Sequence, residues 1–155
     1  LYMRDVIFVS GFAIGAATIS FNFFMVFGRL IGDKIRDTLG TFNFLITLFI
    51  FSLSGLFIII NFSTLLSSIL GFSVLGLGIS SIVPLAYSIA GKVKEIDSAV
   101  GISIISIAGY GVFMIAPAIM GLIANLYGLS IVFLPMTLLF IICLIFVVIN
   151  RKQFI

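Results

Sequence analysis

The chain alternates between long apolar blocks and short segments that carry its charges. Each residue adds about 1.5 Å to a helix, so crossing a hydrocarbon core of about 30 Å takes roughly 20 residues. A membrane β-strand would instead alternate polar and apolar residues over about ten positions. The pattern therefore predicts an all-α polytopic membrane bundle with five transmembrane helices in a single membrane domain, residues 1–155. The five blocks without Asp, Glu, Lys or Arg are 6–28, 42–60, 65–90, 99–124 and 131–150.

Composition excludes a soluble fold and removes several kinds of chemistry. Of the 155 residues, 63% are hydrophobic and 8% are charged, whereas soluble domains have about 25% charged residues. The chain has no histidine, no tryptophan and one cysteine, Cys143. No disulfide can form within it, and a structural zinc site needs about four Cys or His ligands. We expect no metal and no cofactor.

Enzymatic and nucleic-acid functions fit the sequence poorly. A serine protease within the membrane needs a histidine base, and an aspartyl protease needs two acids at depth, whereas Asp33 and Asp37 share one charged segment. The net charge of +3 is not gathered on a soluble surface, so we expect no nucleic-acid partner. The basic residues are better explained by orientation in a lipid bilayer.

The charges predict the orientation of the chain. All basic residues except Arg4 fall in segments that would share one side of the membrane. By the positive-inside rule this side is cytoplasmic, which predicts a cytoplasmic C-terminus in a plasma membrane. Because the start, Leu1, would lie outside before an odd number of spans, we expect earlier spans to be missing. The basic residues on the predicted cytoplasmic side are Arg29, Lys34, Arg36, Lys92, Lys94, Arg151 and Lys152.

Glycine divides the spans into two classes. Small residues let membrane helices approach closely, whereas Leu, Ile and Phe suit contact with acyl chains. The first, third and fourth spans are rich in glycine, the second has only Gly55, and the fifth has none. This distribution predicts interior positions for spans 6–28, 65–90 and 99–124 and peripheral positions for the other two.

Polar residues at helical spacing form one stripe on each predicted interior span. Such stripes could converge on a solute cavity, and they are also typical of plain helix-packing seams. Two prolines lie inside these spans, where a missing N–H bends a helix; Pro84 and Pro117 are the predicted bends. The substrate-cavity candidates are Thr18, Asn22, Ser80, Tyr87, Ser106 and Tyr110.

A charged segment between the first two spans carries a resemblance to a known family. Residues 28–40 read GRLIGDKIRDTLG. The segment resembles the loop motif of glycine, acidic and basic residues in the major facilitator superfamily, in the looser form between the eighth and ninth spans. The strict first-half form places its acid four residues after the glycine, whereas Asp33 lies five after Gly28. This departure fits a second-half copy.

The resemblance extends along most of the chain. The stretches GFSVLGLG at 71–78 and PLAYSIAG at 84–91 look like the tenth span of bacterial sugar- and drug-type members. The triplet GYG at 109–111, followed by Pro117 and Gly121, looks like the eleventh, and IANLYGL at 123–129 looks like the turn into the twelfth. On this alignment the chain is spans eight to twelve, part of the second half of a twelve-helix fold.

The resemblance implies two six-helix halves that alternate access to a central site, with the amino-terminal part supplied elsewhere in the same or a separate chain. In the charged loop, Asp33 can pair with Arg29 or Arg36 and accept hydrogen bonds from a neighbouring helix N-terminus, which would stabilise one conformation. The alternative is a loop that only sets orientation, but acids add little to orientation, so Asp33 and Asp37 favour a gating role. The charges Lys92, Lys94, Glu95 and Asp97 are interpreted as a solvated loop.

The resemblance also implies transport of a small solute. No block contains a carboxylate that could titrate within the membrane, so proton coupling resides in the missing part or transport is uniport. A neutral or amphiphilic solute is favoured. The alternative is a non-transporting membrane subunit or the remnant of a split or decayed transporter gene. A self-assembling channel is disfavoured because no amphipathic stripe runs through every block.

Overall fold

The computed structural model describes residues 1–11, 13–93 and 96–151. Within these residues the fold is all α, as predicted. Lys94, Glu95 and Lys152, which enter the charge pattern above, lie outside the described residues. The helices are α1 (Tyr2–Asp5), α2 (Ala13–Leu39), α3 (Thr41–Asn61), α4 (Leu65–Ile79), α5 (Ile82–Ala90), α6 (Ser98–Tyr127) and α7 (Phe133–Ile149).

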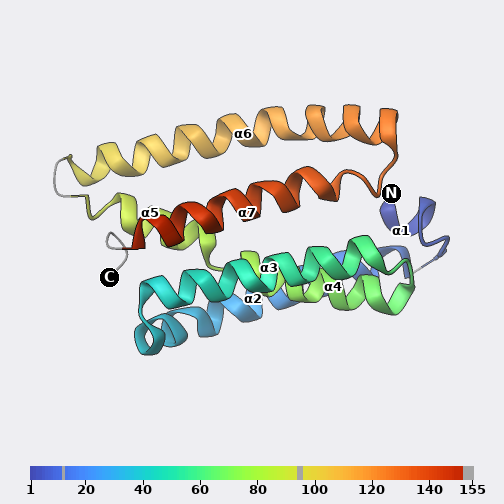
Figure 1. Ribbon diagram of the computed structural model, residues 1–155, viewed down its shortest axis with the longest axis horizontal. Coiled ribbons are helices and arrows are strands. Elements are labelled where there is room, and N and C mark those ends of the chain that lie inside the picture. Colours follow the sequence, from blue (N-terminus) through green and yellow to red (C-terminus); the bar gives the residue numbers. More distant parts are fainter. Residues whose placement is uncertain (12, 94–95, 152–155) are drawn as a thin grey trace.

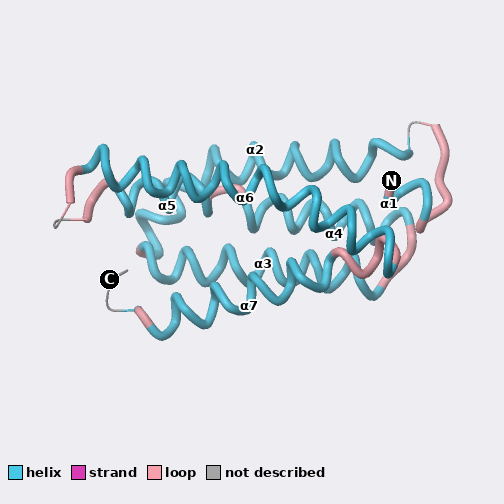
Figure 2. The backbone as a smooth tube through the Cα atoms, turned by 90° about the horizontal axis from the view of Figure 1, so that it is seen from above, coloured by secondary structure: helices cyan, strands magenta, loops and turns pink. Residues whose placement is uncertain are grey.

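The long helices run side by side along the longest axis of the molecule (Figure 1). Helix α3 packs mainly on α4 and also on α7, α4 also packs on α2, and α5 packs on α6. Seen from above, the loops gather at the two ends of the bundle (Figure 2). Four stretches, namely α2, α3, α4 with α5, and α6, are long and apolar enough to cross a membrane, and α7 is a shorter apolar helix of 17 residues. The chain is a multi-pass membrane protein.

Helix α2 lies further along the chain than the first predicted span, 6–28. Residues 6–11 are not helical, and both Phe8 and Gly11 have positive φ angles, 59° and 62°. The helix then continues through the charged segment to Leu39. The prediction of a loop over residues 28–40 is therefore wrong. Hydropathy marks where apolar side chains end, whereas a helix continues through charges spaced along its surface until a residue such as Gly40, with φ 78°, turns the chain.

The third predicted span, 65–90, is two helices. Helix α4 ends at Ile79, α5 begins at Ile82, and Ser81 between them has φ −112° and ψ 1°. The start of α4 is capped reciprocally, because Thr64 Oγ1 accepts a hydrogen bond from the backbone N–H of Ser67 at 3.2 Å, and Ser67 Oγ accepts one from that of Thr64 at 3.1 Å. The predicted span thus begins at a well-capped helix end, and the break lies well inside it, between Ile79 and Ile82.

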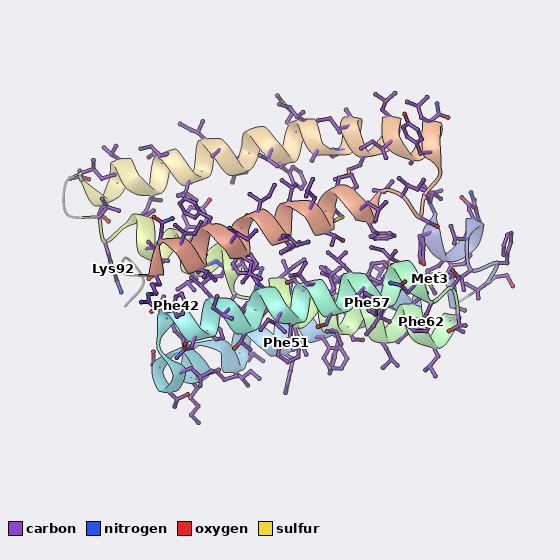
Figure 3. The ribbon with its side chains drawn as sticks, in the orientation of Figure 1. Met3, Phe42, Phe51, Phe57, Phe62 and Lys92 are labelled. Atoms are coloured by element: carbon purple, nitrogen blue, oxygen red, sulfur yellow. The ribbon has the colours of Figure 1, made fainter. Side chains whose placement is uncertain are left out.

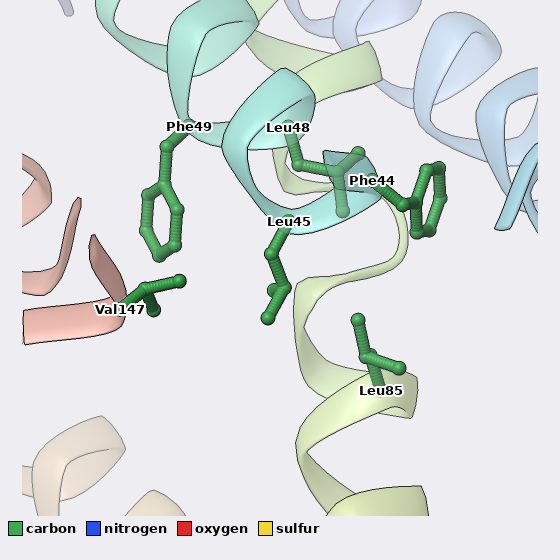
Figure 4. Close-up of a cluster of buried hydrophobic side chains, with 6 residues drawn as sticks. All are labelled: Phe44, Leu45, Leu48, Phe49, Leu85 and Val147. Atoms are coloured by element: carbon green, nitrogen blue, oxygen red, sulfur yellow. The ribbon is translucent and has the colours of Figure 1, made fainter. Parts of the chain in front are cut away.

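Helix α3 supplies most of the buried core, so its predicted peripheral position is wrong for this structure. Its apolar side chains pack against Leu85 of α5 and Val147 of α7 in one cluster (Figure 4). A second cluster joins Leu56 and Ile59 of α3 to Leu75 of α4. Glycines on the neighbouring helix make this possible, because the Cα of Gly78 lies where an added Cβ would collide with Ser52. Gly55 of α3 likewise lies against the backbone of α4 at Leu75, so small residues on both helices let the two backbones approach closely.

Helix α6 is exposed along most of its length, so its predicted interior position is also wrong for this structure. Only Gly101 among its residues is buried, and Figure 1 shows the helix at one edge of the bundle. Large apolar side chains also point outward on the other helices; Phe51, Phe57 and Phe62 are exposed (Figure 3). Apolar surface of this kind suits acyl chains or further helices.

The short helix α1 closes one end of the bundle. Tyr2 donates a hydrogen bond from its hydroxyl to the carbonyl of Ile59 at 2.9 Å. Its ring packs edge to face on Phe133 and Phe72, with ring centroids 5.2 and 6.2 Å apart. Burial raises the pKa of the Tyr2 phenol, so the group remains a donor at neutral pH. One side chain thus ties α1 to α3, α4 and α7.

Candidate functional site

The charged end of α2 borders a cavity of about 310 Å³ at the end of the bundle that carries Lys34, Arg36, Lys92 and Arg151, here called the basic end. The last three turns of α2, the start of α3 and the first turn of α5 form its walls. Its lining brings three predicted gating residues together with Pro84, a predicted bend. The lining residues are Arg29, Asp33, Arg36, Phe44, Ser81, Pro84 and Leu85.

Arg29 binds the broken helix directly. Its Nε donates a hydrogen bond to the carbonyl oxygen of Ser80 at 2.9 Å. In a regular helix that carbonyl would accept from the N–H four residues later, and this position is Pro84, which has no N–H. The guanidinium therefore supplies a donor where the proline has removed one. The regular pattern resumes at the next residue, where Leu85 N–H donates to Ser81 O at 3.0 Å.

The acidic residues pair with Arg36. One Asp33 carboxylate oxygen lies 3.1 Å from Arg36 Nη1, and one Asp37 oxygen lies 3.1 Å from Nη2. The Asp33 side chain is 82% exposed, so this ion pair contributes about 0–1 kcal/mol. Of the two partners predicted for Asp33, the structure thus shows Arg36, one helical turn further along the same helix.

Two glycines bring α2 against the break, and the polar-stripe analysis did not single them out. A Cβ at Gly28 would lie 2.6 Å from Ser80 Oγ, and one at Gly32 would lie 2.5 Å from Ser81 Oγ. Both distances are shorter than ordinary contacts, so a side chain at either position would require a serine to shift; at Gly28 the Cβ of Ser80, 2.8 Å away, is also too close. The spacing Gly28-x-x-x-Gly32 is the signal that could have revealed the seam, because small residues four apart mark close helix pairs.

The cavity candidates on α5 and α6 form one linked pair. The hydroxyl of Ser106 lies 3.2 Å from that of Tyr87 and 2.9 Å from the carbonyl of Ile102, and it can donate to one of them at a time. Tyr110 lies one turn beyond Ser106 and is 77% exposed. Tyr87 and Ser106 thus join α5 to α6, and the Tyr110 hydroxyl is free to meet a ligand or another helix.

The remaining cavity candidates have local roles in this structure. Thr18 and Asn22 are exposed on α2, where Asn22 Nδ2 donates to the carbonyl of Thr18 at 2.8 Å. Ser80 is buried, with its hydroxyl donating to the carbonyl of Leu77 at 2.6 Å. The amide of Asn22 therefore finds its partner within its own helix. Helix α6 is continuous through Pro117.

The donors in the basic-end cavity suit charge pairing rather than metal binding. Two guanidinium groups and one carboxylate face it, and metals of the Mg²⁺ or Ca²⁺ type need several oxygen ligands. Within residues 1–11, 13–93 and 96–151, no group of three or more His, Cys, Asp and Glu residues comes together. A second, mainly apolar cavity of about 620 Å³ lies between α3 and α7, with Phe57 and Leu134 in its lining.

Comparison with known proteins relates the chain to membrane transporters. It is 33% identical over 109 residues to an uncharacterized MFS-type transporter of Yersinia pestis, a match that covers 70% of this chain and 28% of that protein. It is 29% identical over 112 residues to membrane protein MosC of Rhizobium meliloti, covering 72% of this chain and 28% of the relative. The chain thus matches a little over a quarter of the length of each relative. No family model matches it, and no solved structure matches it.

Proposed function

We propose that the chain is a carboxy-terminal portion of a major facilitator type secondary transporter that moves a small solute across the membrane. The observation that carries the proposal is the 33% identity to an MFS-type transporter over 109 residues. The segment 28–40 supports it, because the residues resembling the family motif border a cavity at the basic end. No covalent chemistry and no cofactor enter this function, so the chain is not an enzyme.

The basic-end cavity would act as part of a gate. Arg29, Asp33 and Arg36 stand on the last three turns of α2, facing the first turn of α5. Charge pairs at the end of a bundle stabilise one arrangement of helices and are exchanged when the helices move. The exposed Asp33 is available for such an exchange, because its pairing with Arg36 contributes little to stability.

The solute would be neutral or amphiphilic. The five apolar blocks carry no charged residue, and a strongly charged solute would require a counter-charge at depth. Tyr110 on α6 and Asn22 on α2 are the polar groups proposed to meet it from this part of the protein. A coupling ion would bind residues of the amino-terminal half of the proposed transporter.

The proposed setting is the bacterial inner membrane with the basic end in the cytoplasm. Lys34, Lys92 and Arg151 stand at that end, and positive charge is retained on the cytoplasmic side. Reporter fusions at position 155 test the orientation. An enzyme that is active only in the cytoplasm should be active in the fusion, and activity only in the periplasm would contradict the topology.

The intact mass of the native product extracted from its own membrane tests the proposal first. A species roughly two and a half times the 16.8 kDa of this chain would be expected for twelve spans of about 20 residues with their loops. Solute uptake into vesicles containing that species should then exceed uptake into empty vesicles. A species near 16.8 kDa that shows no flux, alone or with a co-purifying partner, would favour the alternative of a non-transporting subunit or remnant.

A further inference from the structure

We propose that Arg29 is a latch that holds a hinge at Ser80–Ser81, about which the α5–α6 pair moves relative to α2, α3 and α4. This inference rests on the proposed function only in saying what the motion serves. The latch itself rests on one hydrogen bond, from Arg29 Nε to Ser80 O at 2.9 Å, and on the reason that this carbonyl is free. In a regular helix this carbonyl would accept from the N–H four residues later, and that residue is Pro84, which has no N–H.

The break is structurally defined and has the features of a hinge. Ser80 keeps helical angles, with φ −46° and ψ −46°, while Ser81 departs to φ −112° and ψ 1°. The N–H of Ser80 donates to Leu77 O at 3.3 Å, a tighter turn than that of an α-helix. With the ladder interrupted here, a small change at Ser81 redirects all of α5. Hinges are typically a few residues at the end of an element.

Helix α2 approaches the break closely through two glycines. Gly28 lies against Ser80 and Gly32 against Ser81, where an added Cβ would require the serine side chains to shift. Arg29, next to Gly28, is thereby held within reach of the free carbonyl. Arg36, the other guanidinium at the cavity, is occupied by Asp33 and Asp37 instead.

Movement at the break would carry α6 with α5. The hydroxyls of Tyr87 and Ser106 lie 3.2 Å apart, and Gly101 of α6 lies directly against the carbonyl of Ala90. Helix α4, by contrast, packs on α2 and α3. Besides the latch, α5 is attached to the bundle by apolar contact. Leu85 sits in the cluster around Phe44 and Leu45 (Figure 4), and Ile82 and Ile89 pack against that cluster. Such an apolar contact permits sliding, whereas the hydrogen bond fixes one position.

Hydrogen exchange of the backbone amides tests the latch without any transport assay. We would compare the intact protein extracted from its membrane with Arg29→Met and with the matched control Arg36→Met, which removes the other guanidinium at the cavity. Amides at the start of α5, such as that of Leu85, should exchange at least about tenfold faster in Arg29→Met, because a charge-assisted hydrogen bond that limits opening is lost. Arg36→Met should change them by less than about twofold, since its partners are exposed carboxylates.

The decisive variant is Pro84→Ala. It restores an N–H for the carbonyl of Ser80, so Arg29→Met should have less than about a twofold effect in that background. Where Arg29→Met alone fails to fold, recovery of the fold by Pro84→Ala is the equivalent result. Equal effects of Arg29→Met on the exchange rates with and without the proline would overturn the latch. An effect of the same size from Arg36→Met would also overturn it, as would a double variant of Arg29→Met and Pro84→Ala that also fails to fold. If the expected exchange rates are found in a protein that shows no solute flux, the latch and hinge stand and only the proposed transport is refuted.

Discussion

Adding one methyl group at Gly28 should separate α2 from the hinge without changing any charge. In Gly28→Ala the new Cβ would lie 2.6 Å from Ser80 Oγ and 2.8 Å from Ser80 Cβ. Ordinary contact begins near about 3.5 Å, so relieving the contact with Ser80 Oγ by separating the helices takes roughly 0.9 Å. If α2 moves directly away, the distance from Arg29 Nε to Ser80 O grows from 2.9 Å to about 3.8 Å, beyond hydrogen-bond range.

Opposing effects set the expected loss of stability. Overpacking a tight interface costs about 1–3 kcal/mol, and a hydrogen bond to a charged group contributes about 1.5–3 kcal/mol. These costs do not add, because the structure either absorbs the strain or gives up the bond. Replacing a mid-helix glycine by alanine gains about 0.5–1 kcal/mol. The net result should be a destabilisation of about 1–2 kcal/mol.

Gly15→Ala is the matched control. It lies on the same helix, and its added Cβ would meet only Ile19 Cδ1 at 3.8 Å, an ordinary contact. We expect it to be neutral or more stable by up to about 1 kcal/mol. The assay is loss of helical circular dichroism in mixed micelles as the fraction of denaturing detergent rises. Equal stability of the two variants would refute the close approach of α2 to Ser80.

Asp33→Asn should change the populations of the inward- and outward-open states and the transport rate. It should lower the free energy of unfolding by less than about 1 kcal/mol, because the side chain is 82% exposed. Unchanged populations and an unchanged rate would count against the gate. Tyr2→Phe should lose about 0.5–1.5 kcal/mol, since its hydroxyl donates to Ile59 O, and detergent unfolding measures this. Because burial raises the pKa of Tyr2 above its ordinary value of 10.0, its contribution should be fully present below about pH 10 and disappear as pH rises through the folded pKa; a loss already at pH 8 would contradict the burial. Tyr110→Phe should raise the apparent KM for the solute and leave unfolding unchanged, whereas a change in stability alone would assign Tyr110 to packing.

The sequence was a good guide to the number of apolar stretches, although the third is two helices, and a poor guide to which helices are neighbours. Blocks 42–60 and 99–124 correspond closely to α3 (Thr41–Asn61) and α6 (Ser98–Tyr127), because the absence of charges over about 20 residues leaves little choice but a helix. Glycine content was misleading for α3. A close helix pair needs small residues only at its few contact positions, here Ser52 and Gly55 of α3 against Gly78 and Leu75 of α4, so a span with a single glycine can still be central.

The charged segment shows separately what the sequence determined and what only the tertiary structure decided. Composition and spacing alone placed Arg29, Asp33 and Arg36 together on one side of the membrane, whereas the structure brought Pro84 beside them. Hydropathy could not show that the segment is helical, because charged residues at the membrane surface suit a loop and a helix equally. Only the tertiary structure decided that Arg36 takes both carboxylates while Arg29 takes the carbonyl of Ser80. The sequence predicts that a proline leaves a carbonyl without its donor, but the donor that replaces it comes from 51 residues away in the chain, and folding alone brings it there.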